Sequence, residues 1–132
     1  MIIKSFDEIE SWKTARELTK EIYSITKIEN FSKDWGLRDQ IRRASISIMA
    51  NTAEGFDSGS DKSFINFLNY AYRSTSEVQS LLYVALDQKY ISQRKFDELS
   101  TECGKIKNLI GGLIKYLSKN SINNHGQRTR HT

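Results

Sequence analysis

The chain has 132 residues, a length that suits one domain around one hydrophobic core, and its net charge is only +4. Hydrophobic residues make up 38% of it, and no apolar run is long enough to cross a membrane, which excludes an integral membrane protein. The only cysteine is Cys103, which excludes a disulfide framework, and the N-terminus has no signal-peptide profile, so we expect a cytoplasmic protein with no membrane partner.

Apolar residues recur with helical spacing along most of the chain, no strand-like alternation occurs, and proline is absent. Four helices are predicted, at about 6–28, 37–57, 61–89 and 93–118. Because short connections make neighbouring helices antiparallel, we predict an all-α protein in which residues 1–118 form an up-down-up-down four-helix bundle. The polar, basic tail 119–132 lacks the apolar residues that folding needs, and it is predicted to be disordered.

The first predicted helix has one apolar face with spacings of three and four residues, made by Ala15, Leu18, Ile22 and Ile25. The second helix is unusual because it has two apolar stripes on opposite sides. The first consists of Leu37, Ile41, Ala44, Ile48 and Gly55. The second consists of Ile46, Met49, Ala50 and Ala53. A helix in a lone bundle needs only one such stripe, so we assign the second to contact with another copy of the chain in a homo-oligomer.

A polar stripe separates these two apolar stripes, and it consists of Gln40, Arg43, Ser47, Asn51 and Glu54. Buried polar groups must find hydrogen-bond partners, since an unsatisfied one costs roughly 1–3 kcal/mol. On the third helix, Ser74 and Glu77 lie at or near the border of the apolar face. We therefore predict a polar seam of these seven residues, which would fix the register of the second and third helices.

The third helix has a broad apolar face, with Ser60 or Asp61 as its expected N-cap. Tyr72 and Tyr83 line up along it with Tyr90. We interpret these tyrosines as the border of the core. The alternative is an interface or a platform on which nucleobases stack.

The fourth helix has the most regular pattern, and Ser92 is its expected N-cap. Its apolar residues alternate in steps of three and four, as in packed helix seams: Phe96, Leu99, Cys103, Ile106, Ile110, Leu113 and Leu117. Gly104 and Gly111, seven residues apart, could form a notch for a neighbouring helix.

Basic residues are concentrated at the C-terminal end, where residues 92–132 hold eight basic and three acidic side chains and no acid follows Glu102. Charge of one sign attracts phosphate-rich partners, so RNA or DNA is a candidate partner. The simpler alternative is that these cations balance a helix dipole and keep a tail soluble. The candidate nucleic-acid contacts are Arg42, Lys105, Lys107, Lys115, Lys119, Arg128 and Arg130.

The sequence offers few side chains that could act in catalysis or hold a metal. Both histidines, His125 and His131, lie in the tail, where no rigid pairing with a nucleophile is expected. The Glu-x-x-His pairs of bundle metal sites, cysteine-rich zinc spacings and glycine-rich phosphate loops are missing from the sequence. We expect no enzyme activity, no metal and no cofactor.

The segment "WGLRDQIRRASISIMANTAEG", after a helix that holds Trp12, Ala15, Leu18, Ile22, Tyr23 and Thr26, resembles a known family. The similar proteins are four-helix bundles encoded in intervening sequences of bacterial large-subunit ribosomal RNA genes. The resemblance covers most of residues 5–118. Ser32 and Met49 depart from it, because relatives often have proline at these positions.

The resemblance implies assembly as a ring-like homopentamer. It also extends to the basic accessory subunit of diversity-generating retroelements, which partners a reverse transcriptase and nucleic acid. The resemblance carries over Arg42 and the polar seam, apart from Gln40, as structural or interface positions only. Two functions stay open from the sequence: a non-catalytic oligomer that binds nucleic acid, or a protein-interaction scaffold or accessory subunit that binds none.

Overall fold

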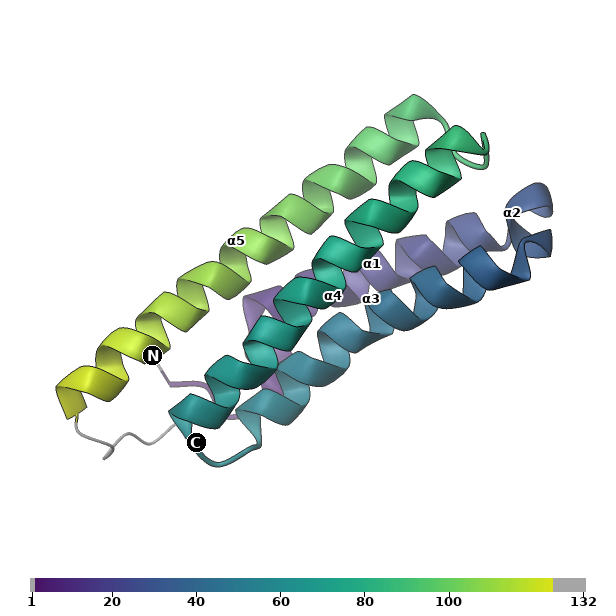
Figure 1. Ribbon diagram of the computed structural model, residues 1–132. Coiled ribbons are helices and arrows are strands. Elements are labelled where there is room, and N and C mark those ends of the chain that lie inside the picture. The colour runs from purple at the N-terminus through teal and green to yellow at the C-terminus, as the bar shows by residue number, and fades with distance from the viewer. Residues whose placement is uncertain (1, 125–132) are drawn as a thin grey trace.

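The computed structural model describes residues 2–124, with side chains described as far as residue 120, and all of its regular elements are helices. They are a 3-10 helix and five α-helices: η1 (Phe6–Glu8), α1 (Glu10–Thr26), α2 (Glu29–Lys33), α3 (Trp35–Phe56), α4 (Asp61–Asp87) and α5 (Gln93–Asn124) (Figure 1). The prediction of an all-α chain is confirmed for the part that the structure describes, which holds no strand.

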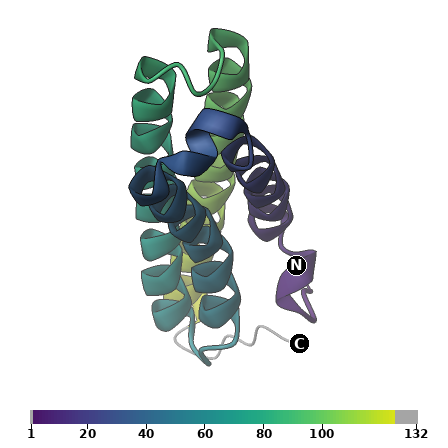
Figure 2. The same cartoon turned by 90° about the vertical axis from the view of Figure 1, so that its right-hand side faces the viewer.

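The four long helices pack side by side, and consecutive long helices run in opposite directions (Figure 1). α4 packs between α3 and α5, and α1 contacts both α3 and α5. The short helix α2 lies across one end, which faces the viewer in Figure 2. Each long helix therefore has one face turned toward its neighbours and one face turned outward.

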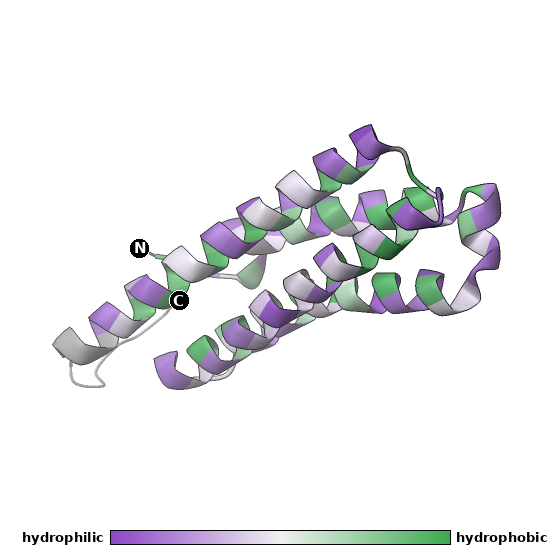
Figure 3. Cartoon of the chain, turned by 45° about the horizontal axis from the view of Figure 1, so that its top comes forward, coloured by the Kyte–Doolittle hydropathy of each residue, from purple (hydrophilic) through white to green (hydrophobic). Residues whose placement is uncertain are grey.

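The core consists of the apolar faces predicted from helical spacing, which face inward between the helices (Figure 3). On α1, the predicted face from Ala15 to Ile25 is buried. On α5, every residue of the predicted seam is buried except Leu113, which is half-buried. Burial of these side chains supplies most of the stability of the fold, since about 25 cal/mol is gained per Å² of apolar surface removed from water.

Side-chain caps define where three of the helices begin. The Asp34 carboxylate accepts a hydrogen bond from the Leu37 backbone N–H at 3.2 Å and begins α3. Ser60 accepts in the same way at the start of α4, at 3.1 Å. Ser92 does so at the start of α5, at 3.0 Å. These caps satisfy backbone donors that the first turn of a helix leaves without a partner.

The helix bounds differ from the predicted ones at three places. The first predicted helix divides into η1 and α1 at Ile9, which has extended backbone and a buried side chain. The expected connection after residue 28 contains α2, because Phe31 buries its ring there. α5 continues to Asn124, six residues beyond the predicted end at 118, so the first part of the predicted tail is helical. The rest of that tail lies outside the described residues.

Candidate nucleic-acid interface and polar seam

Hydrogen bonds connect five of the seven predicted residues, and two of these bonds cross from α3 to α4. The hydroxyl oxygens of Ser47 and Ser74 lie 2.9 Å apart across the two helices. The Asn51 amide nitrogen donates to both the hydroxyl and the backbone carbonyl of Ser47, each at 2.9 Å. One turn from Ser74, the Gln40 amide donates to the Glu77 carboxylate at 3.1 Å. The Ser47–Ser74 contact is half-buried and the Gln40–Glu77 contact is exposed, and we define these five residues as the polar seam.

The other two predicted members of the seam are not drawn into it. Arg43 and Glu54 are exposed, and neither has a hydrogen bond or ion pair to another residue within the described chain. Arg43 acts only through its charge: the pKa of Asp39 is lowered, mainly by the hydrogen bond from Arg38 and to a smaller degree by Arg43. The polar seam therefore consists of Gln40, Ser47, Asn51, Ser74 and Glu77.

The second apolar stripe of α3 lies outside the core. Ile46 is 42% exposed, and Met49, Ala50 and Ala53 are half-buried, with Met49 packed against the edge of the core. In the single chain this stripe borders solvent, and its assignment to a subunit contact stays a prediction.

Three of the predicted cationic contacts form an open basic surface on the outer side of α5. Lys105, Lys115 and Lys119 are exposed, and none forms an ion pair within the described residues. Lys107 is half-buried instead: its ammonium donates to the Gln79 side chain at 3.0 Å and lies 4.9 Å from the centroid of the Tyr72 ring. Two more of the predicted contacts, Arg128 and Arg130, lie outside the described residues.

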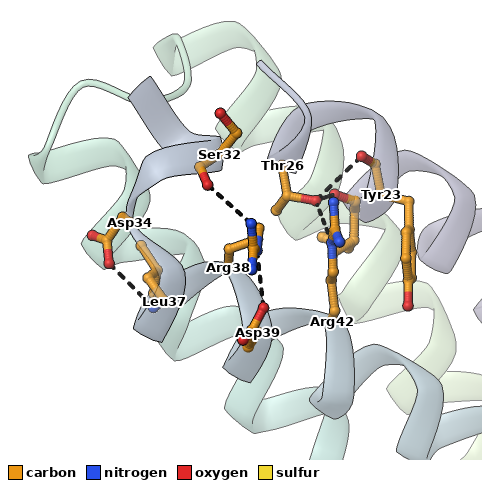
Figure 4. Close-up of polar contacts among 9 residues, drawn as sticks. Tyr23, Thr26, Ser32, Asp34, Leu37, Arg38, Asp39 and Arg42 are labelled. Carbon is orange, nitrogen blue, oxygen red and sulfur yellow. Dashed lines mark hydrogen bonds and ion pairs between the residues drawn. The ribbon is translucent and has the colours of Figure 1, made fainter. Parts of the chain in front are cut away.

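Arg42 is half-buried, whereas a nucleic-acid contact has to be open to solvent (Figure 4). Its Nε donates to the Thr26 hydroxyl at 2.8 Å, and its Cζ lies 4.4 Å from the centroid of the Tyr23 ring. The guanidinium is thus held in the contact between α1 and α3. We therefore leave Arg42 out of the candidate nucleic-acid interface.

Sequence reasoning missed the polar contacts around α2. Arg38 donates to the Ser32 carbonyl at 3.1 Å, which ties α3 to α2 (Figure 4). The Tyr90 hydroxyl donates to Asp34 at 2.9 Å, and its ring stacks on Phe31 with centroids 5.0 Å apart. This hydrogen bond to Asp34 raises the pKa of Tyr90. A cap signal at Asp34 was present in the sequence, but no local signal indicated a partner 56 residues away.

Two tyrosines of the predicted stripe, Tyr72 and Tyr83, lie at the border of α4 with α5, whereas Tyr90 lies beyond the end of α4 and stacks on Phe31. The rings of Tyr83 and Phe96 meet edge to face with centroids 4.7 Å apart. Tyr72 receives the Lys107 ammonium, as described above. Both rings stay partly exposed, at 38% for Tyr72 and 59% for Tyr83, so they lie at the edge of the core and keep part of their surface for other contacts.

The described residues offer little for catalytic or metal chemistry. Residues 2–124 contain no cluster of three or more His, Cys, Asp or Glu side chains arranged to hold a metal ion. Burial raises the pKa of the Cys103 thiol to about 12, which keeps it protonated and poorly nucleophilic near neutral pH. Within the same range, the helices are all too short or too polar to cross a bilayer.

The sequence model for the 23S rRNA-intervening sequence protein matches residues 7–112. Among solved structures, the chain is similar to a protein with unknown function from the S23 ribosomal protein family of Bacteroides thetaiotaomicron VPI-5482. The two sequences are 25% identical, the match covers 80% of this chain and 95% of that chain, and the TM-score is 0.74. No curated protein sequence matches the chain.

Proposed function

The chain belongs to the 23S rRNA-intervening sequence protein family, and from that premise we propose that it is a non-catalytic helical protein that self-assembles and binds RNA or DNA through a basic surface. The observation that carries the proposal is the outer side of α5, where Lys105, Lys115 and Lys119 are exposed and have no ion pair within the described residues. Unpaired surface cations neutralise phosphates and release counterions, which favours binding.

The contrast with the beginning of α5 supports this choice of surface. There Arg94 pairs with Glu98 at 3.4 Å, and Lys95 pairs with both Glu21 and Glu98 at 3.3 Å. Hydrogen bonds to Glu98 and Glu21 accordingly raise the pKa of Lys95. Basic residues with acidic neighbours are already compensated, whereas the later lysines are not. The uncompensated positive charge of α5 therefore lies from Lys105 onward.

Self-assembly is the second part of the proposal. In it, α1, α3, α4 and α5 form an up-down-up-down four-helix bundle, and the second apolar stripe of α3 contacts a sister chain in a ring. The resemblance recognised in the sequence implies five subunits. A ring would repeat the lysines of α5 around its axis, and repeated contacts raise the overall affinity for a long phosphate chain.

A salt series of nucleic-acid binding tests the proposal. Fluorescence anisotropy with a labelled RNA and the full chain should show an affinity that falls steeply between about 50 and 200 mM salt. Replacing Lys105, Lys115 and Lys119 by glutamine should weaken binding. It should also flatten the salt dependence by roughly one slope unit for each phosphate that these lysines neutralise.

A matched control separates this surface from net charge. Lys13, Lys20 and Arg94 are exposed but paired within their own helices, so their triple glutamine variant loses the same charge. Equal effects of the two triple variants would refute the assignment to α5. No binding by the full chain at low salt would refute nucleic-acid binding altogether.

Light scattering tests assembly. The full chain should have a mass of several subunits at micromolar concentration, and Ile46→Asp should lower that mass. Ile28→Asp is the control, because Ile28 is also an exposed isoleucine, at 57%, but lies outside the stripe. A monomeric, well-folded full chain would exclude the proposed ring.

A protein-interaction scaffold without nucleic-acid binding is the second candidate function. The observation that favours it is at the end of the molecule where α2 lies, where Trp35 is 69% exposed and Ile28, the N-cap of α2, is exposed as well. Tryptophan is strongly enriched among the residues that dominate protein–protein binding energy. If RNA and DNA fail to bind at low salt, this surface becomes the leading candidate.

A further inference from the structure

The outward face of α4 has a surface pocket of about 290 Å³ that neither the lysines of α5 nor the polar seam explains. It is lined by Asn66, Asn69, Tyr70, Tyr72 and Arg73, all of which are exposed. Asn66, Asn69, Tyr70 and Arg73 are spaced by three, four and seven residues, which places them on one side of the helix, and Tyr72 borders the pocket at the edge toward α5. The pocket therefore combines aromatic rings, carboxamides and a guanidinium on a rigid element.

The aromatic rings of this pocket are held in place but remain open. Tyr70 is 51% exposed, and the edge-to-face contact of its ring with Phe67 has centroids 6.3 Å apart. The Arg73 guanidinium lies 4.9 Å from the centroid of the Tyr70 ring. Tyr72 has the Lys107 ammonium at the same distance. A ring whose orientation is already restricted loses less entropy when a flat ligand stacks on it.

The polar groups of the pocket are unused. Asn66 and Asn69 have no hydrogen-bond partner among the described residues, so each amide keeps donors and an acceptor for a ligand. The sequence of α4 contains no acidic residue between Asp61 and Glu77. The charges at the pocket itself are therefore the cations that lie against its two tyrosines.

We propose that this pocket stacks and hydrogen-bonds the unpaired bases of single-stranded nucleic acid, an inference that rests on the nucleic-acid binding proposed above. Tyrosine rings stack with any base, amide groups pair with base edges, and the exposed Arg73 neutralises an adjacent phosphate. Base faces are covered in a duplex, so the pocket selects single strands. The lysines of α5 then supply attraction to phosphate in general, and α4 supplies the preference for unpaired bases.

The test compares single-stranded and duplex RNA of equal length as probes, with the full chain and its variants. Tyr70→Ala should weaken binding of the single strand roughly five- to a hundred-fold, the range that loss of one base–aromatic stack produces, and should leave duplex binding unchanged. Tyr70→Phe keeps the ring face and should bind like the unsubstituted chain. Arg73→Gln should lower the salt slope by about one unit.

Tyr83→Ala is the matched control. Tyr83 is an exposed tyrosine of the same helix, at 59%, and also has one edge-to-face ring contact, but it does not line the pocket. Its substitution should leave single-strand affinity unchanged. Thermal unfolding and light scattering of each variant establish that fold and assembly are intact. If Tyr70→Ala is unstable, Asn69→Ala tests the same pocket with a smaller change.

The outcomes separate this inference from the proposed function. If the unsubstituted chain binds neither probe, the proposed function fails and this inference fails with it. If the chain binds but Tyr70→Ala and Asn69→Ala bind as tightly as it does, only the pocket is refuted. Equal losses of affinity for single strand and duplex would show that the pocket does not distinguish unpaired bases. A change of assembly mass in Tyr70→Ala would assign the face to a subunit contact. Either result would overturn the inference.

Discussion

Arg42 and Thr26 join α3 to α1 by a hydrogen bond of 2.8 Å from Nε to the threonine hydroxyl. Thr26 is fully buried and its own hydroxyl reaches the Ile22 carbonyl at 2.7 Å, so its oxygen is free to accept from the guanidinium. The Cζ of the same guanidinium lies over the Tyr23 ring, 4.4 Å from its centroid. The Arg42 side chain thus links α1 to α3 through both contacts, and its role is structural.

We predict that Arg42→Ala lowers the free energy of unfolding by about 1–2 kcal/mol, because it removes a charge-assisted hydrogen bond and a cation–π contact. Urea unfolding followed by circular dichroism measures this. Arg43→Ala is the control: its exposed side chain has no hydrogen bond within the described residues, so the change should stay within about 0.5 kcal/mol. A larger loss in Arg43→Ala than in Arg42→Ala would contradict the assignment of roles.

The polar seam predicts a ranking of two substitutions. Ser74→Ala removes the half-buried partner of Ser47, and we expect a loss of about 0.5–1.5 kcal/mol in the free energy of unfolding. Gln40→Ala removes a bond to Glu77 between two exposed side chains, where water replaces the partner, so the loss should be smaller. Chemical unfolding of both variants decides the order. The reverse order would mean that the seam does not fix the register of α3 and α4.

Most of the core could be predicted because it depends on local spacing. The alternation of three and four residues on α5 places Leu99, Cys103 and Ile106 on one side of a helix, and all three are buried. Such periodicity depends only on helix geometry, which is the same in every context. The seam partners Ser47 and Ser74 could be inferred in the same way, because both lie at the border of an apolar face.

The remaining contacts could not be predicted because they depend on how distant segments meet. Phe31 lies in a stretch without helical periodicity. It is buried because the chain brings Tyr90, which follows α4, to stack on its ring. Arg42 and Arg43 are identical residues side by side, yet one is held against α1 and the other is exposed. Only the rotation of α3 about its axis, which packing determines, separates their roles.

The buried thiol of Cys103 makes the free energy of unfolding depend on pH in the alkaline range. Burial, with a smaller effect of the Glu102 charge, raises the pKa of its thiol from 9.0 to about 12 in the folded chain. Between these values the unfolded chain binds fewer protons than the folded chain, so the free energy of unfolding falls as pH rises and is unaffected below about pH 9. Urea unfolding at about pH 8 and pH 11 should show a steeper loss for the unsubstituted chain than for Cys103→Ala. Parallel losses would show that the thiol is not buried in solution.

Glycines on α3 and α5 predict opposite effects of the same substitution. A Cβ at Gly55 would lie 2.7 Å from the Phe67 Cβ and 2.9 Å from the Phe64 ring, so α3 and α4 could no longer approach as closely. Overpacking costs about 1–3 kcal/mol, which offsets or exceeds the gain of about 1 kcal/mol that alanine brings to a helix. Gly55→Ala should therefore fail to stabilise the chain and should lower its melting temperature if Phe67 cannot move.

Gly111→Ala is the counterpart, because a Cβ there would meet no atom within 4 Å in the described chain. Helix propensity then acts alone, and we expect a gain of about 0.5–1 kcal/mol in the free energy of unfolding. Thermal unfolding of both variants, with light scattering in parallel, tests the pair. If Gly111→Ala instead destabilises the chain and reduces its assembly mass, the glycine lies against a neighbouring subunit, which would place α5 as well as α3 in the proposed ring.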